Sequence, residues 1–182
     1  MGLRGVGAPA GGWKRPGHVI RYLLDSSALW RVLRDAALRA SWAEVVSLGV
    51  IGSCHPQRVG FRRSARTADE YEQMSQMFDV LYPDAAVPKG AWRWIESAQY
   101  RLVRHGAHRA LSAVDLLICA TAVHHDLIVL HDDGNFVTAA RYLTDLRERS
   151  IRDRPPADLS ACPGSPPKDE APPEARHRNP GS

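Results

Sequence analysis

The sequence has few cysteines, few lysines and no long apolar run. Three of its 182 residues are cysteine, and their spacing matches no metal-ligand pattern. Three widely spaced cysteines argue against a disulfide scaffold and favour a reducing compartment. No apolar run approaches the roughly 18 residues that a membrane-spanning helix needs, and the first residues lack the apolar segment of a signal peptide. We therefore expect a cytoplasmic protein with no membrane segment.

The shortage of lysine defines the positive charge of the chain. Lysine and arginine together number 24 against 20 acidic residues, a formal net charge of +4, and all but three of the 24 are arginine. Arginine binds phosphate and carboxylate groups through two parallel N–H donors. This composition fits a nucleic-acid substrate, although genome bias produces the same enrichment.

Proline and glycine divide the chain into three parts. Residues 1–18 are rich in glycine and proline, and residues 151–182 hold most of the prolines among mixed charges. Such segments bury too little apolar surface to offset the entropy lost when they become ordered. We predict a disordered N-terminal arm at 1–18, one domain at 19–150 and a disordered Pro-rich C-terminal tail at 151–182.

Within that domain, short apolar strands alternate with longer helical patterns. Strands are predicted at 19–24 and 127–131, with a short strand or a buried turn at 49–53. Helices are predicted at 26–34, 38–48, 56–67, 68–81, 88–104, 112–125 and 138–149. Strands separated by helices are typical of a parallel sheet covered on both faces, so we expect a helix-rich α/β fold.

Three aspartates lie at the ends of these apolar segments. Asp25 follows the first strand, Asp133 follows the strand at 127–131, and Asp115 opens the helix between them. Parallel strands end at one edge of the sheet, where open α/β proteins bind ligands, and a helix entering after a loop can bring Asp115 to that edge. Each aspartate also has a local alternative: a helix cap for Asp25, a capping box for Asp115 and a turn for Asp133.

Taken together, the three carboxylates predict a metal site. Clustered carboxylates repel one another unless a cation lies between them. Magnesium, with manganese as an alternative, prefers oxygen ligands in octahedral geometry. Such an ion activates water and neutralises charge on a phosphate. We therefore expect metal-dependent hydrolysis of phosphodiester bonds, with Asp25, Asp115 and Asp133 as metal ligands and catalytic residues.

The segments around these aspartates resemble the signature motifs of PIN-domain ribonucleases, and most closely the toxins of VapBC-type toxin–antitoxin pairs. The segments are LLDSSAL at 23–29, VDLLICATA at 114–122 and VLHDDGNF at 129–136. The resemblance covers about residues 19–150 and implies a small three-layer α/β/α domain with a short parallel sheet. It also implies a Mg²⁺-dependent endoribonuclease, a cognate antitoxin as partner and a homodimer.

Two polar positions beside the aspartates can be compared with the family pattern. Ser27 falls on the small polar position next to the metal site. Asn135 stands where the family often has a further aspartate, just before Phe136. We expect both side chains to lie beside the metal.

The sequence departs from the family at Gly60. The family usually has a fourth acid there, a glutamate four residues before the segment Ser-Ala-Arg, which is found here at 64–66. A missing carboxylate weakens metal binding and slows catalysis. One alternative is a weakened or inactive PIN-domain protein that binds RNA or an antitoxin; in another, Glu44 or Glu70 reaches the pocket instead.

A basic ridge is predicted beside this position. Arg58, Arg62 and Arg66 recur every four residues and would line one face of the helix predicted at 56–67. Next to an acidic metal site, they would bind RNA phosphates without reading bases. The alternatives are a solvated arginine face and a docking face for acidic antitoxin residues.

Two further features receive structural interpretations. His131 lies near the acids, and we expect a satisfied structural histidine rather than a metal ligand. A helical apolar stripe is typical of a core or dimer interface. The stripe consists of Trp92, Ile95, Gln99, Leu102 and Val103.

Other α/β phosphate enzymes fit less well. A haloacid-dehalogenase-like phosphatase needs a second aspartate two residues after Asp25, where Ser27 stands. A response-regulator receiver needs a lysine at a late strand end, and neither Lys89 nor Lys168 is so placed.

Overall fold

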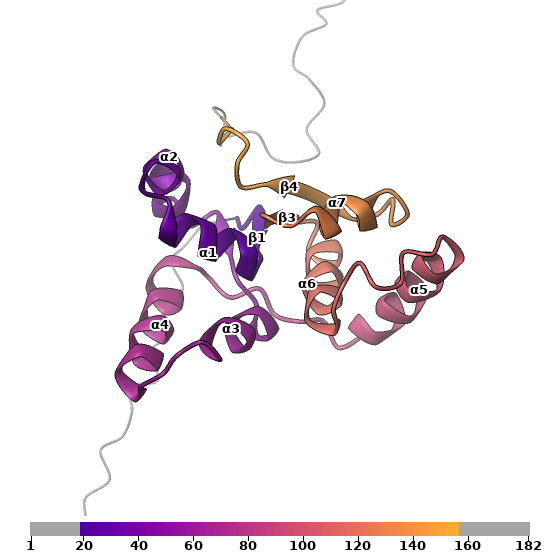
Figure 1. Cartoon of the computed structure of the whole chain (residues 1–182), viewed down its shortest axis with the longest axis horizontal. Coiled ribbons are helices and arrows are strands. Elements are labelled where there is room, and N and C mark those ends of the chain that lie inside the picture. Colours follow the sequence, from indigo (N-terminus) through magenta and orange to yellow (C-terminus); the bar gives the residue numbers. More distant parts are fainter. Residues whose placement is uncertain (1–18, 157–182) are drawn as a thin grey trace, which may run out of the picture.

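The computed structural model describes residues 19–156 and shows an α/β fold (Figure 1). The predicted arm at 1–18 and the tail beyond residue 156 lie outside the described residues. The strands are β1 (Tyr22–Leu24), β2 (Ile51–Gly52), β3 (Ile128–His131) and β4 (Arg147–Ser150). The helices are α1 (Ser26–Arg34), α2 (Ala36–Ser47), α3 (His55–Arg62), α4 (Ala68–Leu81), α5 (Ala91–Arg104), α6 (Ala113–His124) and α7 (Gly134–Ala140).

The strands form a parallel sheet in the order β2-β1-β3-β4. Successive side chains of a strand point to opposite faces, so Leu23 and Val129 pack against α5, α6 and α7. Tyr22, Leu24 and Leu130 pack on the other face, against α1, α2 and α4. Figure 1 shows α1–α4, in indigo to magenta, on one side of the strands and α5 and α6 on the other. The predicted three-layer α/β/α arrangement is confirmed.

Most of the predicted elements are confirmed, with shifts of one to three residues at their ends. α1 and α4 have the predicted bounds, and β2 forms where a short strand or buried turn was expected. α4 begins where predicted because the Thr67 hydroxyl accepts a hydrogen bond from the Glu70 N–H, which caps the helix.

The helix predicted at 56–67 is shorter than expected. α3 ends at Arg62, and the N–H groups of Ser64 and Ala65 close tight turns onto Phe61 and Arg62. The chain turns there because Thr67 starts a new helix five residues later, with its own cap. Residues 63–67 therefore do not continue the face of α3.

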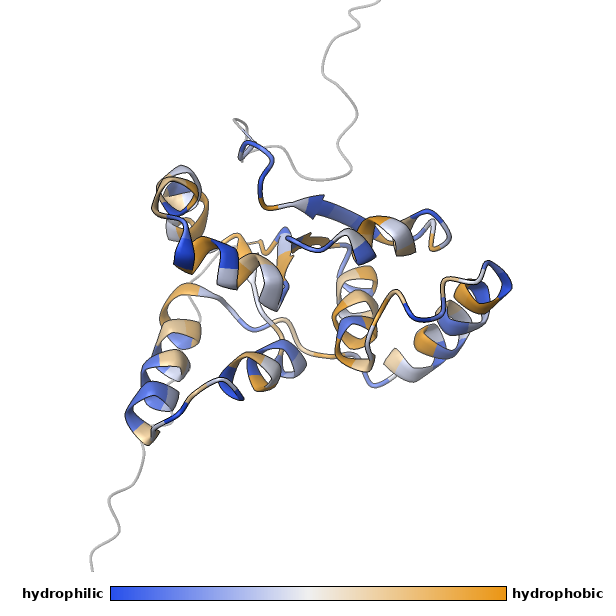
Figure 2. Ribbon diagram, viewed as in Figure 1, coloured by the Kyte–Doolittle hydropathy of each residue, from blue (hydrophilic) through white to orange (hydrophobic). Residues whose placement is uncertain are grey.

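The prediction of a helix at 138–149 is wrong. α7 ends at Ala140, and residues 147–150 form β4, which pairs with β3 from Ile128–Arg147 to His131–Ser150. Pairing with β3 outweighs the helical preference of this Arg- and Leu-rich segment. β4 lies at the edge of the sheet, and Figure 2 shows it as hydrophilic. Charged side chains on an edge strand discourage pairing with other chains.

The predicted domain boundary at residue 150 is too early. Ile151 is 1% exposed and belongs to the core against α1 and α2. Its N–H donates to the His131 carbonyl at 2.7 Å, and its carbonyl accepts from Trp42 Nε1 at 2.9 Å. Between residues 19 and 156, no helix has the length and apolar character needed to cross a membrane.

Candidate functional site

Asp25 lies where β1 meets α1, at the edge of the sheet predicted to carry the site. Its N–H donates to the Leu130 carbonyl at 2.9 Å, which ties it to β3. Its carboxylate caps α1 by accepting from the Ser27 N–H at 2.8 Å and the Ser27 hydroxyl at 2.5 Å. Asp25 is 4% exposed. Asp25 therefore caps α1 and also provides a buried carboxylate at the end of β1.

Asp115 lies close enough to act electrostatically on Asp25. Burial raises the pKa of Asp25, the hydrogen bonds from Ser27 lower it, and the Asp115 charge raises it again. The charges of both aspartates also reach Cys119, one turn along α6, where burial is the main cause of a pKa well above the usual value. The first and second predicted ligands therefore share one region of the molecule.

Asp115 also forms the capping box that its sequence predicts. Its Oδ2 accepts from the Ser112 N–H at 2.8 Å, while the Ser112 hydroxyl accepts from the Asp115 N–H at 3.2 Å. This reciprocal capping box begins α6. It also orients the carboxylate at the helix end that carries the positive end of the backbone dipole.

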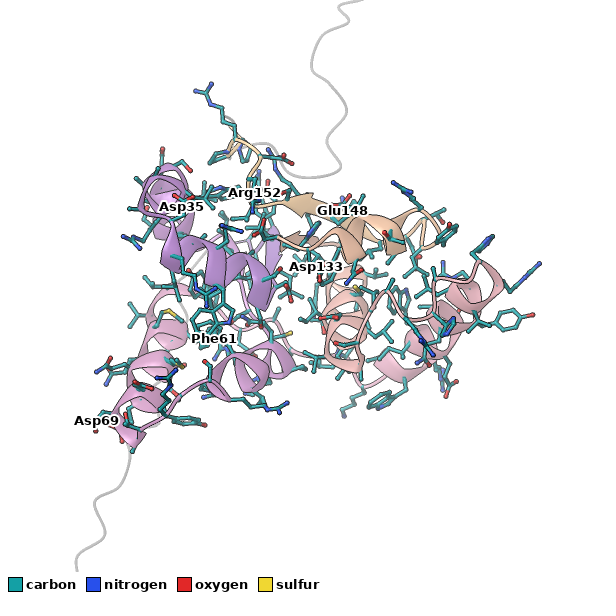
Figure 3. The ribbon with its side chains drawn as sticks, viewed as in Figure 1. Asp35, Phe61, Asp69, Asp133, Glu148 and Arg152 are labelled. Carbon is teal, nitrogen blue, oxygen red and sulfur yellow. The ribbon has the colours of Figure 1, made fainter. Side chains whose placement is uncertain are left out.

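Asp133 occupies the connection from β3 to α7 (Figure 3). Its carboxylate caps α7, accepting from the Asn135 N–H at 2.9 Å and from Asn135 Nδ2 at 3.2 Å. Asn135 therefore contacts this aspartate directly. Within residues 19–156, no three Asp, Glu, His or Cys side chains are close enough to hold a metal ion as a group. The three aspartates thus do not form a closed cage.

The donors present fit a hard divalent cation that keeps part of its water shell. Asp25 and Asp115 supply carboxylate oxygens, which magnesium prefers. In the described part of the chain, no cationic side chain is among the groups that set the pKa of Asp25. Magnesium is usually held by one or two carboxylates, with water and phosphate oxygens completing its six ligands. An open pair of carboxylates suits this mode of binding.

Asp132 has a structural role that distinguishes it from its neighbour Asp133. Its carboxylate accepts from Arg31 Nε at 2.7 Å and from Arg152 Nε at 2.5 Å. Burial opposes ionisation of Asp132, but the two arginines lower its pKa below the usual value. Its N–H donates to the Ser27 hydroxyl at 2.9 Å. Sequence reasoning missed this network because its members lie far apart in the chain and no local pattern marks them.

Ser27 joins the two strand ends beneath the site. Its hydroxyl donates to Asp25 and accepts from the Asp132 N–H, so one side chain links the end of β1 to the end of β3. A serine here positions the Asp25 carboxylate.

His131 is a satisfied structural residue, as predicted. It is 2% exposed, and its Nε2 lies 2.7 Å from Glu148 Oε2 on β4. Its Nδ1 accepts from the Asp133 N–H at 3.1 Å. Both ring nitrogens are therefore used in joining β3 to β4 and in shaping the turn to α7.

The predicted arginine ridge is not one helix face. Arg58 donates to the Ser53 hydroxyl at 2.8 Å and to the Tyr82 carbonyl at 2.9 Å, and its guanidinium lies over the Phe78 ring. Its side chain is 11% exposed. This arginine joins β2, α3 and α4 and is not free to bind phosphate.

Of the other two arginines of the predicted ridge, Arg62 packs on α4 as Arg58 does, whereas Arg66 does not lie on α3. Arg62 lies over the Tyr71 ring and donates to the Ser75 hydroxyl at 3.1 Å, so it packs on α4. Arg66 lies beyond the end of α3 and is exposed. Arg58 and Arg62 therefore share the face of α3 that packs on α4, and Arg66 is not part of it because α3 stops before this residue.

Gly60 faces the start of α6. Apart from its chain neighbours and the backbone of α3, a Cβ atom built at this position would have Val114 Cγ1 as its nearest neighbour, at 4.0 Å. Val114 directly precedes Asp115. The position at which we expected the family's fourth acid therefore has space toward the helix that carries the second aspartate.

The apolar stripe on α5 divides between two faces. Ile95 and Leu102 are buried in the core, as one of the two interpretations predicts. Trp92 is 63% exposed and Val103 is 57% exposed. These two side chains and Gln99 remain on the surface of α5.

Comparison with known sequences matches the described domain. The model of the PIN domain family matches residues 22–142. Ribonuclease VapC6 of Mycobacterium tuberculosis is 59% identical over 101 residues, which is 56% of this chain and 80% of the relative. Ribonuclease VapC21 of the same species is 29% identical over 116 residues, covering 64% of this chain and 83% of the relative.

Solved structures match the fold. The structure of VapBC2 from Rickettsia felis bound to a DNA fragment from their promoter matches with a TM-score of 0.58 and 10% identity, over 72% of this chain and 98% of that chain. FitAcB from Neisseria gonorrhoeae matches with a TM-score of 0.55 and 18% identity, over 71% of this chain and 97% of that chain. At these identities, the likeness shows a shared arrangement of helices and strands.

Proposed function

This chain belongs to the PIN-domain family as a VapC-type ribonuclease toxin, and on that premise we propose that it hydrolyses RNA at the sheet edge where Asp25 and Asp115 meet. VapC-type nucleases are in general metal-dependent; the specific ion proposed here is Mg²⁺, with Mn²⁺ able to replace it. The proposed ligands are Asp25 and Asp115, with Asp133 approaching from the turn before α7.

The observation that carries this proposal is the unneutralised pair of carboxylates. Asp25 is buried, and its pKa is raised. The one charged group among the causes of that shift is another carboxylate, that of Asp115. Two such groups are costly to keep ionised side by side unless a cation joins them. A structural cap alone explains neither the burial nor the pairing, because caps elsewhere in this chain, such as Asp35, are not buried.

The chain's own residues would contribute positioning. Ser27 donates to Asp25 and holds its carboxylate in one orientation. The Ser112 capping box does the same for Asp115, and Asn135 does so for Asp133. The bound cation would supply an activated water and neutralise charge on the scissile phosphate. With three aspartates held in advance, little reorganisation is needed when the RNA binds.

We also propose three partners for this chain: a cognate antitoxin, a second copy of the chain and RNA. The structural neighbours include VapBC and FitAcB assemblies, and a VapC-type toxin pairs with an antitoxin. A cognate antitoxin would hold this chain inactive, and the exposed Trp92 and Val103 on α5 suit a homodimer contact. RNA phosphates would be bound by exposed arginines such as Arg66 and not by Arg58.

Gly60 supports a second candidate function. Without the usual fourth acid, the same fold would bind RNA or its antitoxin with weakened or no cleavage. Apart from the chain neighbours of Gly60, the one described side chain within 4.0 Å of the position a Cβ would take is that of Val114, so no other carboxylate lies there. A wild-type chain that binds RNA but leaves it intact in Mg²⁺ would favour this second function.

The test of the first function is cleavage of RNA by the full chain in Mg²⁺, compared with Asp25→Asn. Asparagine caps a helix as well as aspartate, so α1 should persist while the metal loses a charged ligand. We expect cleavage to fall by more than about 100-fold, because outer-shell partners of metals alone are worth 10–100-fold. Gel analysis of a labelled RNA measures the rate.

Asp35→Asn is the matched control. Asp35 also caps a helix, accepting from the Leu38 N–H at 3.0 Å, but it caps α2, and Figure 3 labels it apart from Asp133. Its activity should equal that of the wild type. Equal activity in wild type and Asp25→Asn would overturn the catalytic assignment.

A further inference from the structure

Gln57 is a fully buried amide without a visible partner. It lies on α3 with 0% exposure. Neither its Oε1 nor its Nε2 has a hydrogen-bond partner among the described residues. A buried polar group left unpaired costs about 1–3 kcal/mol, and such groups in native structures usually have a water, ion or ligand as the missing partner.

The helix geometry shows the direction of this amide. Successive residues of an α-helix are about 100° apart, so Gln57 lies about 40° from Phe61 and about 60° from Gly60 around α3. The Phe61 ring contacts the Trp30 ring of α1 at 4.5 Å between centroids. Gly60 faces Val114 at the start of α6. Gln57 therefore points between α1 and α6.

The position of Gln57 along α3 also brings it near the aspartates. Gln57 lies in the first turn of α3, three residues after Cys54, which is the N-cap residue of that helix. Burial raises the pKa of the Cys54 thiol to about 11, and the Asp25 charge is among the causes of the rise. Asp25 caps α1 and Asp115 lies in the first turn of α6. The space between those two helices is thus bounded by two carboxylates and, from α3, by one amide.

We propose that Gln57 is a positioning residue of this site, whose amide hydrogen-bonds the water shell of the bound cation from the α3 side. The inference rests on the proposed metal site between Asp25 and Asp115. An amide suits this place because it both donates and accepts hydrogen bonds and adds no third negative charge. It occupies the helix that lacks the family's fourth acid, one turn before Gly60.

The test is to titrate the metal-free full chain with Mn²⁺ and to measure the binding affinity by calorimetry. Wild type, Gln57→Met and Gln57→Glu are compared. Methionine keeps the length of the side chain and removes both polar atoms. We expect Gln57→Met to weaken Mn²⁺ binding about tenfold, the range for outer-shell partners of metals. We expect Gln57→Glu to tighten it. The metal-free unfolding temperature of Gln57→Met should not fall, because no paired group is lost.

Gln76→Met is the matched control, since Gln76 lies exposed on α4; its Mn²⁺ affinity should not change. Unchanged Mn²⁺ affinity in both Gln57 variants would overturn the inference, as would a lower metal-free unfolding temperature with unchanged affinity. If Gln57→Met does not fold, Gln57→Glu alone decides.

Asp25→Asn separates this inference from the proposed function. If Asp25→Asn weakens Mn²⁺ binding and the Gln57 variants do not, only the role of Gln57 fails. If Asp25→Asn leaves Mn²⁺ binding unchanged, the proposed metal site fails, and the role of Gln57 fails with it.

Discussion

At the scale of single residues, this site is made of side chains that each serve two purposes. Asp25 caps α1 and Asp115 closes the capping box of α6, yet the Asp115 charge also raises the pKa of Asp25. Capping places a carboxylate at the positive end of a helix, where the backbone dipole favours negative charge. The local structural role and the proposed catalytic role are therefore compatible, because the same orientation serves both.

For a single residue, we predict that a glutamate in place of Gly60 increases activity without harming the fold. Gly60→Glu should fold, because the space toward Val114 is open and a glutamate is a better helix former than glycine by roughly 0.5–1 kcal/mol. It should also raise Mg²⁺-dependent RNA cleavage by about tenfold or more, since it adds a carboxylate beside Asp115. The rate of cleavage and the midpoint of urea unfolding measure the two effects.

Val59→Glu is the control for that substitution. Val59 precedes Gly60 on α3 and is 56% exposed, so a glutamate there adds the same charge on a different face. Its cleavage rate should stay near that of the wild type. If wild type already cleaves RNA and Gly60→Glu adds nothing, the idea of a weakened member fails.

At the scale of elements, α5 is held to the rest of the fold by an aspartate in the loop between α7 and β4. Asp145 accepts from Trp94 Nε1 at 2.6 Å and from Arg101 Nη1 at 2.8 Å. One carboxylate in a connecting loop thereby contacts two residues that lie two turns apart on α5. Partial burial opposes the charge of Asp145, but Arg101 and Trp94 lower its pKa below the usual value.

The direction of that pKa shift predicts a pH dependence. A carboxyl whose pKa is lower in the folded state stabilises the fold above its unfolded pKa, and the contribution is lost as the pH falls through the folded value. Asp145→Asn should therefore lower the free energy of unfolding near neutral pH by up to about 1 kcal/mol, a small effect because the pair is partly exposed. The difference from wild type should shrink as the pH falls below about 4.

Urea unfolding at several pH values measures this difference. Glu96→Gln, on an exposed position of α5, is the control and should show no comparable change. A difference between Asp145→Asn and wild type that stays constant down to acid pH would contradict the prediction.

At the scale of the whole molecule, two apolar cores lie on opposite faces of one sheet. Ile151 fills the core on the α1–α2 side, and Arg152 reaches back to Asp132 at the end of β3. The chain after β4 is therefore part of the domain and supports the turn that carries Asp133.

Truncation tests this extent of the domain. A chain ending at residue 156 keeps every contact described, and its unfolding temperature should match that of the full chain. A chain ending at residue 150 loses Ile151, the acceptor for Trp42 Nε1 and the Arg152 ion pair. It should lose about 3 kcal/mol or more of unfolding free energy, since removal of a buried isoleucine side chain alone costs 2–5 kcal/mol. Equal stability of the two truncated chains would contradict this boundary.

Local signals were enough for much of the fold. The cap at Asp25, the capping box of Ser112 and Asp115, and the apolar runs of β1 and β3 each lie within a few residues, so their sequence patterns predict them. Such interactions form between residues that are close in the sequence, and these residues are close together whatever fold the chain adopts. Helix and strand identities near these residues were accordingly predicted well.

The sequence by itself determined that three aspartates stand at strand and helix ends, because the apolar runs before and after them dictate those ends. Only the tertiary structure decided that Asp132 is held by Arg31 and Arg152, that Arg58 is directed inward, and that residues 147–150 form a strand. These outcomes depend on partners that are distant in the chain. Their energies arise from burial and pairing, which no local pattern records.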